Sequence, residues 1–190
     1  PRMLRVMWLD GKREDFGISE NRFAKPADLE NVIVVENLRS FLTLPDHPRT
    51  LAIFGEGRAS QTLTKIGWLG STRLFYWGDL DPYGFNILSA LRAEFSGVQS
   101  ILMNRDAFQR FADLIAPTPI PHFKLSDSLP FADPGWIRLA AEELAAARAT
   151  LHETKTIDCG VHARGIEQEK IPLAEAAKET LRALSRGLVP

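Results

Sequence analysis

Short apolar runs of strand length, separated by amphipathic stretches, restrict this chain to a small set of folds. The clearest run is Val32-Ile33-Val34-Val35, whose four β-branched residues without polar alternation are typical of a strand buried on both faces. Further strand-like runs occupy residues 3–9, 50–54, 73–77 and 98–103. Segments with helical spacing lie between or after them, at residues 37–44, 58–66, 82–95 and 107–115. This alternation predicts an α/β fold with a mostly parallel central sheet of about four strands, flanked by helices on both faces.

The two ends of the chain differ from this middle part. Residues 10–28 are polar and broken by glycine and proline, which predicts a loop with a short edge strand. Prolines crowd residues 117–134 and predict a connector rather than a core element. A strong helix is expected after Asp133-Pro134, running to Leu151, and a final helix over residues 173–184. The predicted organisation has three parts: a lead-in of strand and loop (1–30), an α/β core (31–116), and a connector with a C-terminal helical extension (117–190).

Composition excludes several classes of protein. The chain is 45% apolar, which is ordinary for a globular domain, and no apolar run approaches the ~18–20 residues that cross a bilayer. A single cysteine, Cys159, excludes an intramolecular disulfide framework and favours a reducing compartment, so we expect a cytoplasmic protein. A formal net charge of −1 argues against a wholly basic nucleic-acid binder but not against a local basic groove. Because the chain begins with Pro1, we expect it to be a piece of a longer protein.

Three carboxylates follow the ends of two predicted strands. Glu36 comes directly after the run at 32–35, and Asp79 and Asp81 follow the run at 73–77. Sites in open α/β sheets lie outside the carboxyl ends of the strands, and residues i and i+2 of an extended segment point the same way. Clustered carboxylates repel one another unless a hard divalent cation lies between them, and oxygen ligands suit Mg²⁺ or Mn²⁺. The sequence therefore predicts a metal site formed by these three residues.

Each acidic motif also has a plain structural interpretation. Asp81 before Pro82 is a good helix N-cap followed by a proline at the first helical position. Glu36 can be a solvated strand end. The combination of a strand-end Glu and an Asp-x-Asp is less common than either motif alone, and this favours the metal site.

The order of these motifs resembles a known family. Val34-Val35-Glu36 followed by Gly78-Asp79-Leu80-Asp81 is similar to the TOPRIM signature, and the continuation Pro82-Tyr83-Gly84 resembles the topoisomerase VI A subunit. The similarity is closer to the C-terminal domain family of JetD, the nuclease subunit of the Wadjet anti-plasmid system, over roughly residues 3–172. The segments that carry it are Val35-Glu36-Asn37-Leu38 with Phe41-Leu42, Tyr76-Trp77-Gly78-Asp79-Leu80-Asp81, Gly84-Phe85 with Ile87-Leu88, Ser100-Ile101-Leu102-Met103, and Ile166-Glu167-Gln168-Glu169-Lys170-Ile171.

This resemblance implies a TOPRIM, Rossmann-like fold and a DNA endonuclease domain that depends on Mg²⁺ or Mn²⁺. It implies cleavage of phosphodiester bonds in plasmid or foreign DNA, with Glu36, Asp79 and Asp81 as metal ligands and catalytic residues. Glu167 is implied as a further catalytic residue and Glu169 as its alternative, although a solvated, charge-rich turn explains both equally well. The implied partners are double-stranded DNA, subunits of an SMC-type, condensin-like complex, and a second copy forming a homodimer. The missing part of the protein is then an amino-terminal DNA-binding region.

Two tyrosines beside the acidic motif are not expected to be nucleophiles. The topoisomerase VI relatives place their nucleophilic tyrosine in a separate winged-helix domain, which Tyr76 and Tyr83 do not match. Tyr76 is expected in the core and Tyr83 in the first turn of a helix, so water is the expected nucleophile. For DNA binding we single out Gly57 and Arg58, since the amides of a glycine turn and an arginine at a helix start can contact phosphates.

Two other functions stay open at this point. A haloacid-dehalogenase-like phosphatase would use Asp79 as nucleophile and Asp81 as acid, but no convincing acidic pair follows Asp81 as that class requires. A non-catalytic scaffold that binds DNA or partner subunits is the third possibility. It predicts no metal binding that depends on the carboxylates.

Overall fold

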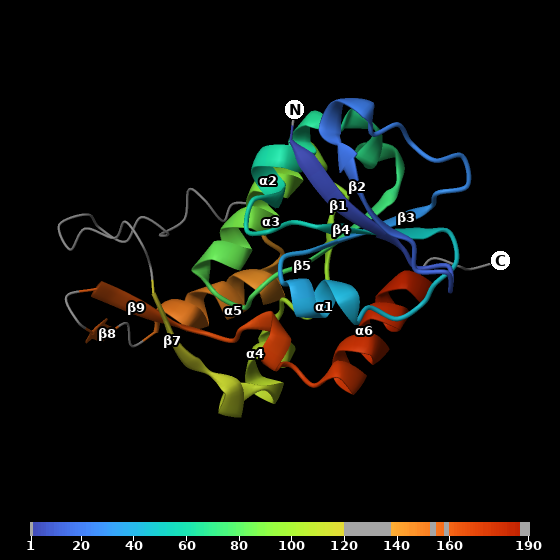
Figure 1. Ribbon diagram of the computed structural model, residues 1–190. Helices are drawn as coiled ribbons and strands as arrows, with labels where there is room; N and C mark the ends of the chain where they lie inside the picture. Colours follow the sequence, from blue (N-terminus) through green and yellow to red (C-terminus); the bar gives the residue numbers. More distant parts are fainter. Residues whose placement is uncertain (1, 120–137, 153–154, 158–159, 187–190) are drawn as a thin grey trace.

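The computed structural model describes residues 2–119, 138–152, 155–157 and 160–186, and its centre is a six-stranded sheet (Figure 1). The strand order is β2-β1-β4-β3-β5-β6. The strands are β1 (Met3–Trp8), β2 (Asp15–Ser19), β3 (Asn31–Val35), β4 (Thr50–Phe54), β5 (Arg73–Trp77) and β6 (Gln99–Ser100). Strands β4, β3, β5 and β6 pair in parallel, whereas β1 pairs antiparallel with both β4 and β2. The expected α/β fold with a mainly parallel sheet is confirmed.

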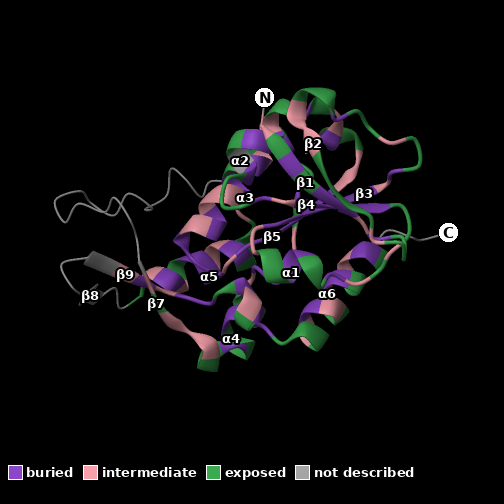
Figure 2. Ribbon diagram, viewed as in Figure 1, coloured by how far each residue is buried: buried purple, intermediate pink, exposed green. Residues whose placement is uncertain are grey.

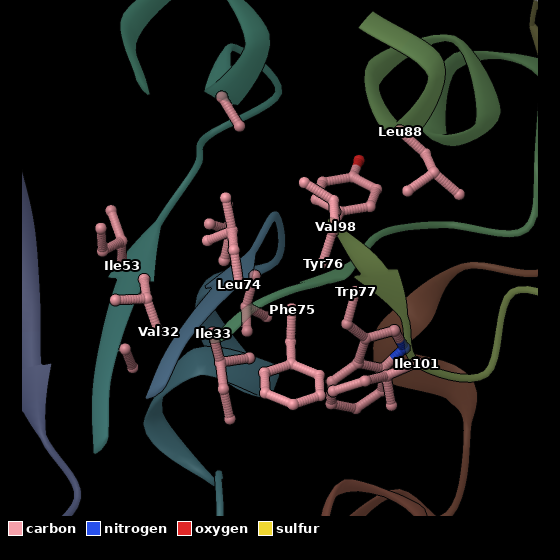
Figure 3. Close-up of a cluster of buried hydrophobic side chains, with 14 of the residues drawn as sticks. Val32, Ile33, Ile53, Leu74, Phe75, Tyr76, Trp77, Leu88, Val98 and Ile101 are labelled. Carbon is pink, nitrogen blue, oxygen red and sulfur yellow. The ribbon is translucent and has the colours of Figure 1, made fainter. Parts of the chain in front are cut away.

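The central strands are buried because helices cover both faces of the sheet. All five residues of β3 are buried, as its β-branched run predicts, and Figure 2 shows buried residues concentrated in these strands. Helices α2 (Ala59–Thr62) and α3 (Pro82–Glu94) lie on one side of the sheet, with α1 (Leu38–Leu42) and α6 (Leu173–Ser185) on the other (Figure 1). Side chains of β5 alternate accordingly, with Tyr76 toward Leu88 of α3 and Phe75 and Trp77 on the opposite face (Figure 3).

Some elements are shorter than their sequence patterns predict. The expected helix at 58–66 is the single turn of α2 followed by 3-10 turns at Leu63–Lys65 and Gly67–Ser71. The expected strand at 98–103 pairs only over β6, because the chain turns away at Leu102, whose φ of 58° is incompatible with a strand. The expected helix at 107–115 is α4 (Arg105–Arg110) plus a 3-10 turn, Ala112–Leu114. Apolar side chains of each segment, such as Leu63, Ile101 and Phe108, are buried, but the backbone is less regular than predicted.

The polar segment after β1 contains the predicted edge strand. This is β2, which pairs with β1 from Met3↔Ser19 to Met7↔Asp15 and forms one edge of the sheet. The lead-in at 1–30 thus adds two antiparallel strands to the parallel part of the sheet. No helix among the described residues has the length and apolar character of a membrane span.

A second, three-stranded sheet, which the sequence patterns did not predict, includes part of the proline-rich connector and of the region after it. It consists of β7 (Ala116–Pro119), β9 (Gly160–Gly165) and β8 (Lys155–Ile157), in the order β7-β9-β8. Proline is tolerated in β7 because this is an edge strand. Since Pro117 and Pro119 are two residues apart, both present the same side of the backbone to β9. Helix α5 spans Ala141–Leu151, and the expected cap Asp133-Pro134 lies outside the described residues.

A buried ion pair joins α5 to the main sheet. The guanidinium of Arg92, on α3, bonds both carboxylate oxygens of Glu143 on α5, and Ser100 of β6 donates to the same carboxylate. Arg92 also donates through Nε to the carbonyl of Val98 at 2.9 Å. Burial alone would raise the pKa of Glu143, but these hydrogen bonds, with one from the Ala140 amide, hold it below its usual value. The pair therefore fixes α5 against α3 and β6.

We expect Glu143→Ala to destabilise the protein by about 3–5 kcal/mol, because the mutation leaves the Arg92 guanidinium buried without its partner. Denaturant unfolding measures the loss. Glu142→Ala is the matched control, since Glu142 is exposed in the same helix turn. Equal stability of the two variants would show that the ion pair contributes nothing to the fold.

Candidate metal and nuclease site

The two acidic motifs meet because their strands are parallel neighbours. Strands β3 and β5 pair with Val35 opposite Trp77, and the amide of Glu36 donates to the carbonyl of Trp77 at 3.3 Å. From these ends the chain leaves in opposite directions, through α1 to β4 and through α3 to β6. Such a switch point is where open α/β sheets bind ligands. A pocket of about 150 Å³ opens there, lined by Glu36, Asp79 and Asp81 together with Gly57, Tyr76 and Tyr83.

Glu36 is held in the pocket by the glycine turn after β4. The amide of Gly57 donates to Oε2, whereas Oε1 is buried and has no hydrogen-bond partner. A Cβ on Gly55 would lie 2.5 Å from Oε1, so this glycine leaves the space that the carboxylate occupies. Burial, and then the charge of Asp79, raise the pKa of Glu36 to about 7 against the opposing hydrogen bond from Gly57.

Asp79 and Asp81 accept hydrogen bonds from different elements. Oδ1 of Asp79 accepts from the backbone amide of Gln168 at 2.7 Å, and burial followed by the charge of Asp81 raises the pKa of Asp79 to about 7. Asp81 is only 6% exposed and caps α3 by accepting from the amide of Gly84 at 2.8 Å. Burial raises its pKa as well. Asp81 therefore fits both interpretations of its motif, helix cap and site residue, because one carboxylate oxygen caps α3 while the residue also lines the pocket.

The late acidic motif lies beside the Asp-x-Asp motif. A backbone bridge joins Leu80 to Ile166 through bonds of 3.0 and 3.2 Å. The charges of Glu169 and Glu167 contribute to the raised pKa of Asp79, and that of Glu167 also acts on Asp81. The Glu167 side chain is 49% exposed and pairs with Lys170 at 3.3 Å, while Glu169 accepts from the side-chain amide of Asn37 at 2.7 Å. The Glu167 carboxylate lies at the edge of this pocket, and its catalytic role stays a prediction.

Of the two predicted DNA contacts, Gly57 lines the pocket, and Arg58 follows it in the chain. Gly57 has a φ of +67° and forms the turn whose amide holds Glu36, while Arg58 is exposed at the start of the short helix α2. Tyr83 is in the first turn of α3, as expected. Tyr76 is fully buried as expected, and burial, together with the charges of Glu36, Asp79 and Asp81, raises the pKa of its hydroxyl.

Several residues of the site were not predicted from the sequence. Gln168 is fully buried and bonded to both acidic segments. Gly78 leaves room for the Tyr76 hydroxyl, which would lie 2.4 Å from an added Cβ, and Gly84 allows α3 to approach the carbonyl of Asp79. The tight glycine spacing around Asp79 was a signal for such close approach. Nothing local marks Gln168, because its partners are far away in the sequence.

The donor set fits a hard divalent cation in its chemistry. All three side chains offer oxygen, and the buried, unpartnered Oε1 of Glu36 is an acceptor that a cation would satisfy. Within the described ranges no three His, Cys, Asp or Glu side chains are already arranged as a complete ligand set. Asp79 and Asp81 each accept a hydrogen bond from a backbone amide at Oδ1, and both line the pocket together with Glu36.

Comparison with known proteins assigns the chain to a family. The family model described as Wadjet protein JetD, C-terminal, matches residues 3–180. The chain belongs to the JetD C-terminal family. No curated protein matches the chain. The resemblance noted in the sequence is thereby confirmed, and the strand-end Glu36, the Asp-x-Asp motif and the late Glu167-Gln168-Glu169 segment all lie within the part that matches the JetD family.

The raised pKa values predict an unusual pH dependence of stability. Folded-state values of about 7 for Glu36 and Asp79 exceed their ordinary values of 4.5 and 3.8, so the folded protein binds more protons than the unfolded chain between these limits. Stability from these groups is present below pH ~4 and is lost as pH rises through about 7. We expect the metal-free protein to melt several degrees lower at pH 8 than at pH 5.5, as scanning calorimetry with a chelator would measure. Glu36→Gln should flatten this slope, and an unchanged slope would contradict the assignment.

Gly55→Ala is expected to displace the Glu36 carboxylate while preserving the fold, because the added Cβ meets only the flexible end of that side chain. Mn²⁺ affinity measured by titration calorimetry should fall by about 10-fold or more. The control is Gly67→Ala, since a Cβ on Gly67 meets no atom within 4 Å. Equal affinities in both variants would show that the position of Glu36 does not matter.

Proposed function

We propose that this JetD-family chain is a DNA endonuclease domain that depends on Mg²⁺ or Mn²⁺ and cleaves plasmid or other foreign DNA as part of a Wadjet-type defence complex. The observation that carries the proposal is the pocket where Glu36, Asp79 and Asp81 come together at the ends of β3 and β5, with all three pKa values raised. Membership in the JetD C-terminal family supports the same conclusion.

The three carboxylates would hold the cation. When bound, the ion would activate water and stabilise charge on the phosphate in a phosphodiester cleavage. Binding would displace the protons that the raised pKa values keep on Glu36 and Asp79 near neutral pH. Asp81 is fixed at Oδ1 by the Gly84 amide and would offer its other oxygen.

Other residues would serve the nucleic acid and the attacking water. The half-exposed carboxylate of Glu167 would accept a proton at the pocket edge. Arg58 and the turn at Gly57 would contact a phosphate of the DNA backbone. By the family relationship we propose double-stranded DNA, the SMC-type, condensin-like subunits and a second copy of the chain as partners, and the cytoplasm as the location.

Plasmid cleavage by the intact protein with its complex partners tests the function. Glu36→Gln and Asp79→Asn should each reduce cleavage by at least ~100-fold with either metal, because each removes a charge that would bind the cation. Asp106→Asn is the control, since Asp106 is an exposed carboxylate on α4.

Three results would contradict the proposal. Cleavage by Glu36→Gln at the wild-type rate would exclude this pocket as the nuclease site. Absence of Mn²⁺ binding in calorimetry would instead indicate a scaffold. Hydrolysis of a simple phosphate monoester that is lost in Asp79→Asn would indicate a phosphatase.

A further inference from the structure

Gln168 is a buried polar residue that bonds both acidic segments, the one around Glu36 and the one around Asp79. It is 0% exposed and lies in the 3-10 turn Gln168–Lys170, about 90 to 130 residues along the chain from its bonding partners. Its Oε1 accepts from the amide of Asn37 at 3.0 Å, and its Nε2 donates to the carbonyl of Trp77 at 3.1 Å. Its own backbone amide donates to Asp79 Oδ1 at 2.7 Å. Every one of these bonds ends on one of the two acidic segments.

These bonds lie where the two acidic segments have little else to hold them together. Past the last paired residues, Val35 and Trp77, a bond of 3.3 Å from the Glu36 amide to the Trp77 carbonyl joins the two strand ends. Gln168 bonds that same carbonyl and also the amide next to Glu36, so its side-chain amide bridges the gap between the segments. A second bond, from the Asn37 side chain to Glu169 at 2.7 Å, strengthens the same bridge.

The surroundings oppose this arrangement electrostatically. When ionised, Glu36, Asp79 and Asp81 repel one another, and the charges of Glu167 and Glu169 add to the repulsion felt by Asp79. A neutral amide that donates to one segment and accepts from the other can hold them together without adding charge or neutralising the carboxylates. The positive charge of a lysine or arginine at this position would compete with a cation for the carboxylates.

We propose that Gln168 is a positioning residue that sets the separation of the Glu36 and Asp79 segments and thereby the cation affinity of the pocket. It acts through these two residues and does not touch the cation itself. The predicted change in metal affinity rests on the proposed function. The predicted coupling of the two segments does not rest on it, because that coupling is measured without metal.

The test uses the isosteric variant Gln168→Met, which fills the same space but makes none of the side-chain bonds. Thr150→Val is the matched control, because Thr150 is also fully buried and bonded, at 2.7 Å to Ala147, but belongs to α5. We expect Gln168→Met to weaken Mn²⁺ binding by about 10- to 100-fold in titration calorimetry, whereas Thr150→Val loses stability but binds normally. Hydrogen exchange of the Asn37 amide without metal should accelerate at least about 10-fold in the methionine variant alone.

The outcomes separate this inference from the proposed function. Normal Mn²⁺ affinity in Gln168→Met, with loss of binding in Glu36→Gln, would overturn the positioning role and leave the nuclease proposal standing. If the wild type binds no Mn²⁺, the nuclease proposal fails, and the exchange of the Asn37 amide alone decides whether Gln168 couples the segments. Should the methionine variant not fold, Gln168→Asn replaces it: it stays neutral, but its side chain is one methylene shorter and cannot bond Asn37 and Trp77 at once, so it should weaken binding too.

Discussion

The parallel pairing of β3 with β5 is the constraint on which the site depends. With Val35 opposite Trp77, the next residues of both strands must emerge at one edge of the sheet, and both are acidic segments. The chain then leaves in opposite directions, so no element of the main sheet fills the space between them. Close packing around that space requires glycine at Gly55 and Gly78, where a side chain would meet Glu36 or the Tyr76 hydroxyl. The strand register thus explains both the pocket and the glycines around it.

Backbone amides rather than cationic side chains hold the three carboxylates. Glu36, Asp79 and Asp81 all accept from main-chain N–H groups, among them those of Gly57, Gln168 and Gly84 respectively. No ion pair identified among the described residues involves any of the three. An arginine or lysine would have lowered their pKa values and competed with a metal ion, whereas amide dipoles orient the oxygens and leave the negative charge uncompensated. This uncompensated charge is what supports the proposed divalent cation.

The sequence predicts where the candidate residues lie in the fold wherever the signal is local. The β-branched run fixes β3 and thus Glu36, and Asp81-Pro82 marks the start of α3 without any knowledge of tertiary contacts. Features that depend on non-local contacts were not predicted. Strand β7 was missed because prolines are normally absent from strands, and they are permitted here only because β7 is an edge strand beside β9. Gln168 was missed for the same reason, since its partners Asn37 and Trp77 are far from it in sequence. The strand at 98–103 was overestimated because burial of Ile101 and Met103 does not require sheet pairing.

The segment at residues 166–168 contacts the acidic pocket, so the functional unit extends beyond the predicted boundary at residue 116. Residues 31–116 contain all three carboxylates but not Gln168, nor Ile166, which bridges to Leu80. The bond from Gln168 to Asp79 and the Arg92–Glu143 pair both cross this boundary, at the acidic pocket and at α3 respectively. Cutting the chain there would expose a buried guanidinium and would leave the Asp79 carboxylate without its amide donor. The core and the region from α5 onward therefore act as one unit, in which the sheet supplies the charges and the late segment holds them in place.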